Sequence, residues 1–143
     1  MDGSTILVPI DFQDASLDAL STSRELAGRL GLEVVLLHVY TIPVVVYPGF
    51  DPIVSPGLPD EIATAAKNAL ETLAAEQGGL RSILKAGDPA SEILKAIGQL
   101  KPALVAMGTH GRKGLAHLLM GSVTEHIVRS SLAPVLTVHA KPR

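Results

Sequence analysis

The sequence predicts an α/β fold, a single-domain open parallel sheet of five strands with helices on both faces. Five short runs of aliphatic and β-branched residues are nearly continuous, which is the pattern of strands buried on both faces. The intervals between these runs carry apolar residues at helical spacing, and strands that alternate with helices form parallel sheets. The chain has 143 residues, so we expect residues 1–143 to fold as one domain.

The first two strands and the helix between them form a β-α-β unit. The strands are "TILVPID" (5–11) and "EVVLLHVY" (33–40). Between them, "ASLDALSTSRELAGRLG" (15–31) carries leucines and alanines near helical spacing. Gly31 suits the left-handed conformation that commonly closes a helix.

The middle of the chain predicts an irregular segment, a second helix and a third strand. Residues 41–59 hold half of the ten prolines, so we expect a long surface segment, and we favour a solvated connection over a lid or a partner surface. Helical spacing resumes in "DEIATAAKNALETLAAEQGG" (60–79), where Gly78 and Gly79 stop the helix. "LRSILKA" (80–86) is the third strand.

A third helix and a fourth strand follow. Asp88 and Pro89 make a good N-cap and first-turn pair. The apolar face of this helix consists of Ile93, Leu94, Ile97 and Leu100. "ALVAM" (103–107) is the fourth strand.

The last helix and strand come after a glycine-rich loop, "GTHGRKGLAHLLMGS" (108–122). Ser122 and Glu125 have the spacing of a capping box, so a helix should begin near Gly121 or Ser122 and run to about Ser130. Pro134 then opens the fifth strand, "PVLTVHA" (134–140).

Composition excludes several classes of function. The formal net charge is -2 and aromatic residues make up 3%. We expect no nucleic-acid partner, because the chain is not basic overall and has few aromatic side chains on which bases could stack. The chain has no cysteine, which rules out disulfides and thiolate sites and fits a cytoplasmic protein. No stretch approaches the 18 apolar residues of a membrane span, so we expect no membrane association.

Familiar catalytic and metal motifs are missing from the sequence. There is no G-x-G-x-x-G after the first strand, no Walker loop, no H-E-x-x-H and no G-x-S-x-G. We therefore assign no catalytic residue and no metal ligand.

The candidate binding site lies at the carboxyl ends of the first and fourth strands, which carry unusual residues. In an open parallel sheet, ligands bind at the carboxyl ends of the strands where the winding reverses. The first strand ends at Asp11 and the fourth at Gly108. If these strands are neighbours, Asp11 faces Gly108 across the crevice, although the sequence alone does not show that adjacency. Asp11 is then either an acceptor for ribose hydroxyls or a helix-capping or solvated group.

The loop and the helix start after the fourth strand could bind an anion. Gly108 and Gly111 can adopt positive φ and bring backbone N–H groups close to a ligand. Gly121 and Ser122 lie where a helix N-terminus offers unsatisfied N–H donors. The plainer alternative is that these glycines are turn residues and that the capping box marks a helix start only.

Side chains around the same loop would add to an anion site. The hydroxyls of Ser122 and Thr124 could contact phosphate oxygens, and Arg112 and Lys113 could supply neutralising charge.

The loop also carries a family resemblance. "GTHGRKGLAHLLMGS" fits G-x-x-G-(nine residues)-G-[ST] at Gly108, Gly111, Gly121 and Ser122, and this pattern resembles the ATP-binding signature of the universal stress protein family. The similarity extends to "ILVPIDF", "LLHVY", "GDPASEIL", "MGTHG", "GSVTEHIV" and "PVLTV", so it spans nearly the whole chain.

This resemblance implies a sheet order of 3-2-1-4-5 in an adenine nucleotide alpha hydrolase-like fold. Asp11 and Gly108 would then meet the ribose, and the backbone of Val39 would read the adenine edge. The residues implied near the base are Pro9, Ile10 and Met107. The residues implied to hold the phosphates are Gly111, Gly121, Ser122, Val123 and Thr124. Where the family usually continues Asp-Phe-Ser, this chain has Gln13 after Phe12, so no hydroxyl role is carried over there.

The resemblance also implies a function. We expect an ATP-binding stress-response switch, with ATP, ADP or AMP bound together with Mg²⁺, that acts on an unidentified regulatory protein partner as a homodimer through residues 134–140. One alternative is an enzyme that slowly hydrolyses ATP or phosphorylates itself. The other is a scaffold whose nucleotide site is vestigial.

Overall fold

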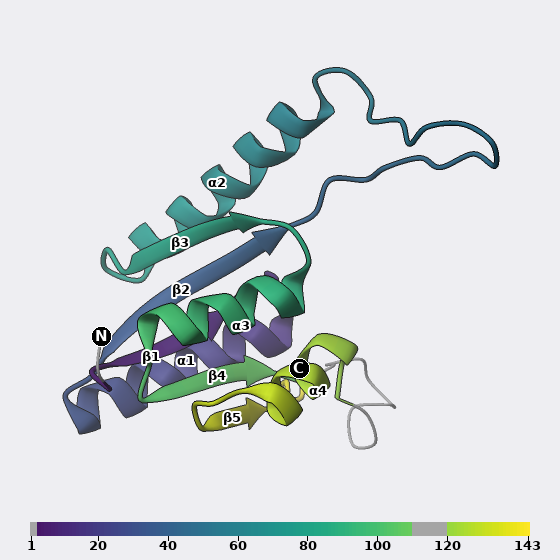
Figure 1. Cartoon of the computed structure of the whole chain (residues 1–143). Helices are drawn as coiled ribbons and strands as arrows, with labels where there is room; N and C mark the ends of the chain where they lie inside the picture. Colours follow the sequence, from purple (N-terminus) through teal and green to yellow (C-terminus); the bar gives the residue numbers. More distant parts are fainter. Residues whose placement is uncertain (1–2, 110–119) are drawn as a thin grey trace.

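The structure, a computed structural model, describes residues 3–109 and 120–143. Its parallel sheet has the strand order β3-β2-β1-β4-β5 (Figure 1), which confirms the predicted fold class and order. The strands are β1 (Thr5–Pro9), β2 (Glu33–Tyr40), β3 (Arg81–Ala86), β4 (Leu104–Gly108) and β5 (Val135–Val138). The helices of the described residues are α1 (Asp14–Leu30), α2 (Leu58–Glu76), α3 (Pro89–Leu100) and α4 (Ser122–Ser130).

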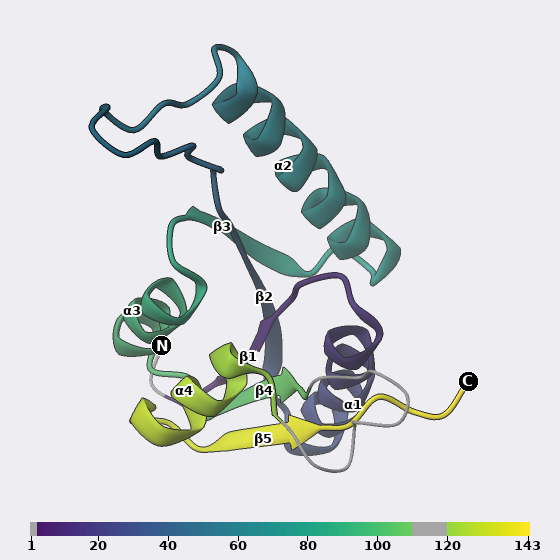
Figure 2. The same ribbon diagram turned by 90° about the vertical axis from the view of Figure 1, so that its right-hand side faces the viewer.

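Helices cover both faces of the sheet (Figure 2). Successive residues of a strand point to opposite faces, so each strand contributes to two cores. The core under α1 and α2 includes Ile6, Leu20 and Leu70. The core under α3 and α4 includes Leu7, Ile97 and Ile127. Strands buried on both sides explain why the apolar runs in the sequence are nearly continuous.

The predicted elements are confirmed, with different ends in several cases. β1 ends at Pro9 rather than reaching Asp11, because Phe12 adopts a left-handed conformation with φ 63° and the chain turns into α1. Gly31 closes α1 with φ 68°, and the Asp88 carboxylate accepts the Ser91 N–H at 3.0 Å at the start of α3. β5 is shorter than residues 134–140.

The expectation that Ser122 and Glu125 form a capping box at the start of α4 is wrong. The helix begins where predicted, but Gly121 is the N-cap, with extended backbone at φ -61° and ψ 154°, and no side chain caps the helix. Ser122 is already inside the first turn. A capping box requires the hydroxyl at the cap position itself, so the backbone N–H groups of this turn stay unpaired by side chains.

The proline-rich segment between β2 and α2 extends away from the sheet (Figure 1). It is irregular apart from one antiparallel bridge between Val45 and Ile53. Its apolar side chains are largely exposed, and Phe50 is 74% accessible. This confirms the expected surface segment. None of the helices in the described part of the chain combines the length and apolar character needed to cross a membrane.

β4 and the first turn of α1 approach each other closely at Gly108. A Cβ on Gly108 would lie 2.3 Å from the carbonyl carbon of Ala15 and 2.5 Å from the nitrogen of Ser16. Gly108 is not among the positive-φ residues, so the expectation that it exploits positive φ is wrong. Glycine is required at position 108 because the backbone of α1 lies where any Cβ atom would have to be.

The segment after β5 crosses α1 and is held by a buried carboxylate. Asp18 accepts the Lys141 N–H at 2.7 Å and pairs with Arg143 at 2.8 Å. The Arg143 guanidinium, and after it the Lys141 N–H, hold the pKa of the Asp18 carboxyl below its ordinary value. The same guanidinium lies 3.8 Å from Asp14 in the first turn of α1.

We predict that Gly108→Ala destabilises the fold by about 1–3 kcal/mol or more, because the added methyl group must push α1 away from β4. The control is Gly98→Ala on the exposed side of α3, where a Cβ meets nothing within 4 Å. That change should raise stability by up to about 1 kcal/mol, since glycine is a poor helix former. Urea denaturation measures both, and equal effects would contradict the close approach.

We also predict that Asp18→Asn lowers the melting temperature at pH 7. A carboxyl whose folded-state pKa is depressed stabilises the fold above its unfolded pKa, and this contribution disappears as pH falls through the folded pKa. The difference in melting temperature between wild type and variant should therefore have its largest value at pH 5–7 and become smaller below about pH 3.9. Asp14→Asn, at an exposed position, is the control with a smaller effect. A pH-independent difference would contradict the ion pair.

Candidate functional site

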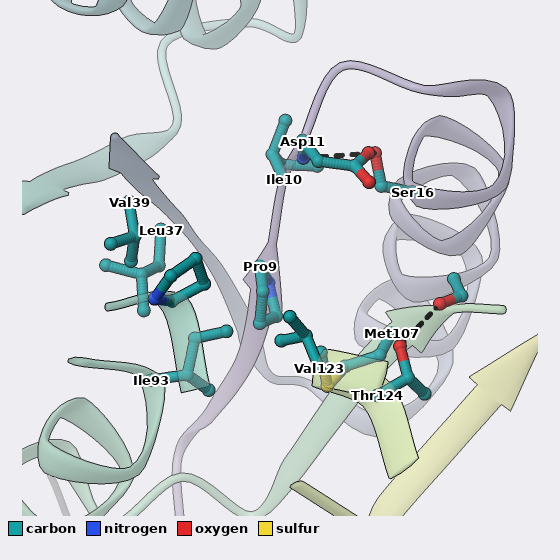
Figure 3. A pocket seen from close by; sticks show the side chains of 12 residues that line it. Pro9, Ile10, Asp11, Ser16, Leu37, Val39, Ile93, Met107, Val123 and Thr124 are labelled. Carbon is teal, nitrogen blue, oxygen red and sulfur yellow. Dashed lines mark hydrogen bonds between the residues drawn. The ribbon is translucent and has the colours of Figure 1, made fainter. Parts of the chain in front are cut away.

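A cavity of about 170 Å³ lies at the carboxyl edge of the sheet, between the ends of β1, β2 and β4 (Figure 3). The pairing of Ile6 with Leu104 makes β1 and β4 neighbours, which is the adjacency that the sequence alone did not show. Aliphatic side chains dominate its walls. The predicted site residues that line it are Pro9, Ile10, Asp11, Val39, Met107, Gly108, Val123 and Thr124.

A second, more polar cavity of about 440 Å³ adjoins the first. The two share Asp11, Ser16 and Gly108, together with the start of α4. Gly121 and Ser122 line only the second cavity. Gly111, Arg112 and Lys113 lie outside the described residues, so their expected contacts stay predictions. The structure thus brings the remaining predicted residues together around one continuous hollow.

Asp11 holds the turn between β1 and α1 with one of its two carboxylate oxygens. Oδ1 accepts the Ser16 hydroxyl at 2.7 Å (Figure 3). The same oxygen accepts the Gln13 N–H at 2.9 Å. Oδ2 makes no hydrogen bond to a described residue, and Asp11 is exposed at the rim. The helix-capping alternative is wrong, because Gln13 is the N-cap of α1 and no side chain caps that helix; Oδ1 holds the preceding turn, while Oδ2 is a free acceptor at the cavities.

The backbone of Val39 presents unpaired polar groups to the first cavity. Leu37 C=O accepts the Ile10 N–H at 2.8 Å, so alternate residues of β2 face β1, and Val39 is the next of these. β1 has ended by that point. Among the described residues, neither the N–H nor the C=O of Val39 has a backbone partner on that side. A donor and an acceptor thus lie side by side at an apolar wall.

Thr124 fixes the start of α4 to the end of β4. Its hydroxyl donates to the Gly108 carbonyl at 2.9 Å (Figure 3) and is buried. That proton is therefore unavailable to a phosphate, although the resemblance implied a phosphate contact at this residue. The backbone N–H groups of Ser122, Val123 and Thr124 belong to the first turn and have no partner within the helix.

The described side chains around the two cavities carry negative charge. Asp11 and Asp14 are the ionised groups among them, and no lysine or arginine of the described residues lines either cavity. Attraction for an anion must therefore come from the N-terminus of α4, from a bound cation, or from Arg112 and Lys113.

Sequence reasoning missed several lining residues. Ser16 lines both cavities from the first turn of α1, and Pro89 and Ile93 line the first from the first turns of α3. A usable signal existed, because a helix that follows a parallel strand begins at the carboxyl edge of the sheet. The first turn after each strand is therefore a candidate for the site even without a motif.

Comparison with known proteins agrees with the fold. The family model described as "Universal stress protein family" matches residues 4–139. Universal stress protein MJ0531 of Methanocaldococcus jannaschii is 33% identical, over 96% of this chain and 82% of its own length.

Solved structures give the same result. MJ0577 of the same organism superposes with a TM-score of 0.76 and 27% identity, over 100% of both chains. A family protein from Arabidopsis thaliana, solved with AMP bound, is 18% identical with a TM-score of 0.61, over 96% of this chain and 92% of its own, which shows a common fold. The chain therefore belongs to the universal stress protein family.

Proposed function

We propose that this protein binds an adenine nucleotide across the two adjoining cavities. The base occupies the aliphatic cavity, the ribose lies between Asp11 and Gly108, and the phosphates occupy the polar cavity. The observation that carries this proposal is the N–H and C=O of Val39 at an apolar wall, which no backbone group of the described residues pairs on the β1 side. Adenine offers N1 as an acceptor and its amino group as a donor on one edge, which complements that pair.

The start of α4 supports the phosphate end of the proposal. Unpaired N–H groups at a helix N-terminus and the positive end of the helix dipole favour an anion. Gly121 carries no side chain at the N-cap, so a phosphate can approach the backbone. The Arabidopsis relative is a case of the fold with AMP bound. ATP, ADP and AMP all share the groups that these residues contact.

Mg²⁺ fits the same cavity. Asp11 and Asp14 line it with carboxylate oxygens, and Mg²⁺ is commonly held by one or two carboxylates together with the phosphates of a nucleotide. The described residues contain no group of three or more metal-binding side chains, so the cation would arrive with the nucleotide. Its chemical contribution would be to neutralise phosphate charge beside two carboxylates.

We further propose a regulatory role, in which nucleotide binding switches the interaction of a homodimer with a regulatory protein in the cytoplasm. Among the described strands, β5 lies at the edge of the sheet and pairs with β4 alone, and an open edge offers its backbone to another chain. Leu132, just before β5, is 96% exposed. These features support a homodimer through residues 134–140. Slow ATP hydrolysis would instead be revealed by multiple-turnover release of ADP.

We predict that ATP stabilises the nucleotide-free protein and that GTP does so much less. At a ligand concentration one hundred times Kd, the stabilisation is about 2.7 kcal/mol. On the corresponding edge of guanine, N1 carries a hydrogen and O6 is an acceptor. The Val39 N–H would then face a donor and the Val39 C=O an acceptor, so we expect at least about tenfold weaker binding. Isothermal titration calorimetry and thermal melting measure this. Absence of any shift with ATP, ADP or AMP would leave the vestigial-site alternative.

We predict that Gly121→Val abolishes nucleotide binding and leaves the free protein folded, because the side chain would fill the approach to the first turn of α4. The backbone angles of Gly121 are ones that other residues adopt, so we expect no backbone strain from the change. The control is Gly98→Val on an exposed face of α3 away from the cavities. The same ATP-dependent melting shift in both variants would contradict the assigned phosphate site.

A further inference from the structure

His38 of β2 holds a backbone carbonyl at the point where β1 and β2 separate. Its Nδ1 lies 2.6 Å from the Ile10 carbonyl oxygen. Because a carbonyl oxygen can only accept, Nδ1 carries the hydrogen and donates it. The ring also packs edge-on against Phe12, with centroids 4.8 Å apart at 63°, which fixes its orientation.

The Ile10 carbonyl is the group that would otherwise pair with Val39. Leu37 C=O accepts the Ile10 N–H, and in a regular parallel ladder the next bond runs from Val39 N–H to Ile10 C=O. Among the described residues that bond is not made. The imidazole makes the bond to Ile10 instead, and the β1–β2 ladder stops one step short.

The side chains of His38 and Val39 lie on opposite faces of the sheet. Phe12 packs with the core under α1 and α2, and the His38 ring contacts it there. Val39 packs with the core under α3 and α4 and lines the first cavity. His38 is not a lining residue of that cavity, so any effect on a bound base must act through the backbone.

We propose that His38 is a positioning residue for base recognition: its hydrogen bond holds the Ile10 carbonyl in a direction that does not meet the Val39 N–H, which stays free for the acceptor nitrogen of an adenine-type base. This inference rests on the proposed function and adds to it the residue on which selectivity for the base depends. A side chain that only fills space would leave the choice between adenine and guanine unchanged.

Two variants separate the donor from the ring. His38→Phe keeps a ring against Phe12 but cannot donate, so Val39 N–H should pair with Ile10 C=O. We expect ATP binding to weaken at least about tenfold and the preference for ATP over GTP to shrink with it. His38→Asn places a donor nitrogen the same number of bonds from the backbone as Nδ1, and should retain most of the affinity and selectivity. An asparagine variant as impaired as the phenylalanine variant would overturn the proposal.

Amide hydrogen exchange tests the same inference without nucleotide. In the free wild-type protein, the Val39 amide should exchange much faster than the ladder-bonded amides of β2, and in His38→Phe it should become protected. A Val39 amide already protected in the free wild type would overturn the role of His38, whether or not ATP binds. Failure of the wild type to bind ATP would overturn the proposed function instead, so the two failures are distinguishable even if the phenylalanine variant does not fold.

Discussion

The reversal of winding between β1 and β4 is the constraint on which the site depends. From β1 the chain builds outward through β2 and β3, and it then returns to place β4 and β5 on the other side. Helices after β1 and β2 therefore cover one face, and those after β3 and β4 cover the other. The first turns of α1 and α4, the helices that come after β1 and β4, lie on opposite faces at the carboxyl edge, and the space between them is left open.

Short polar contacts keep that space open and shaped. Thr124 ties the start of α4 to the Gly108 carbonyl, and Gly108 in turn admits the backbone of α1 at a distance that no other residue would allow. Asp11 fixes the turn into α1 through Ser16 and Gln13. The rim thus combines this local turn with contacts between β4, α1 and α4, which are distant in sequence, so the cavities depend on the packing of several elements.

Polarity along the hollow follows from the same geometry. Residues facing the inside of the sheet edge come from buried strands and are aliphatic, whereas residues at the beginning of helices offer unpaired N–H groups. One end is therefore apolar, with a backbone donor and acceptor at Val39, and the other end is polar, with carboxylates and a helix N-terminus. A ligand with a flat base, a sugar and a charged tail matches this order.

The sequence by itself determined the alternation of strands and helices, because burial on both faces leaves continuous apolar runs and because Gly31 and Asp88 act through local backbone geometry. It also indicated Asp11, Gly108 and the start of α4 as site residues. Only the tertiary structure decided that Gly108 is glycine for lack of space and that Gly121 and not Ser122 is the N-cap. It also decided that the Val39 N–H has no partner among the described residues of β1 and the turn after it. These features depend on the approach of segments distant in the chain, and such approaches leave no periodic pattern in sequence.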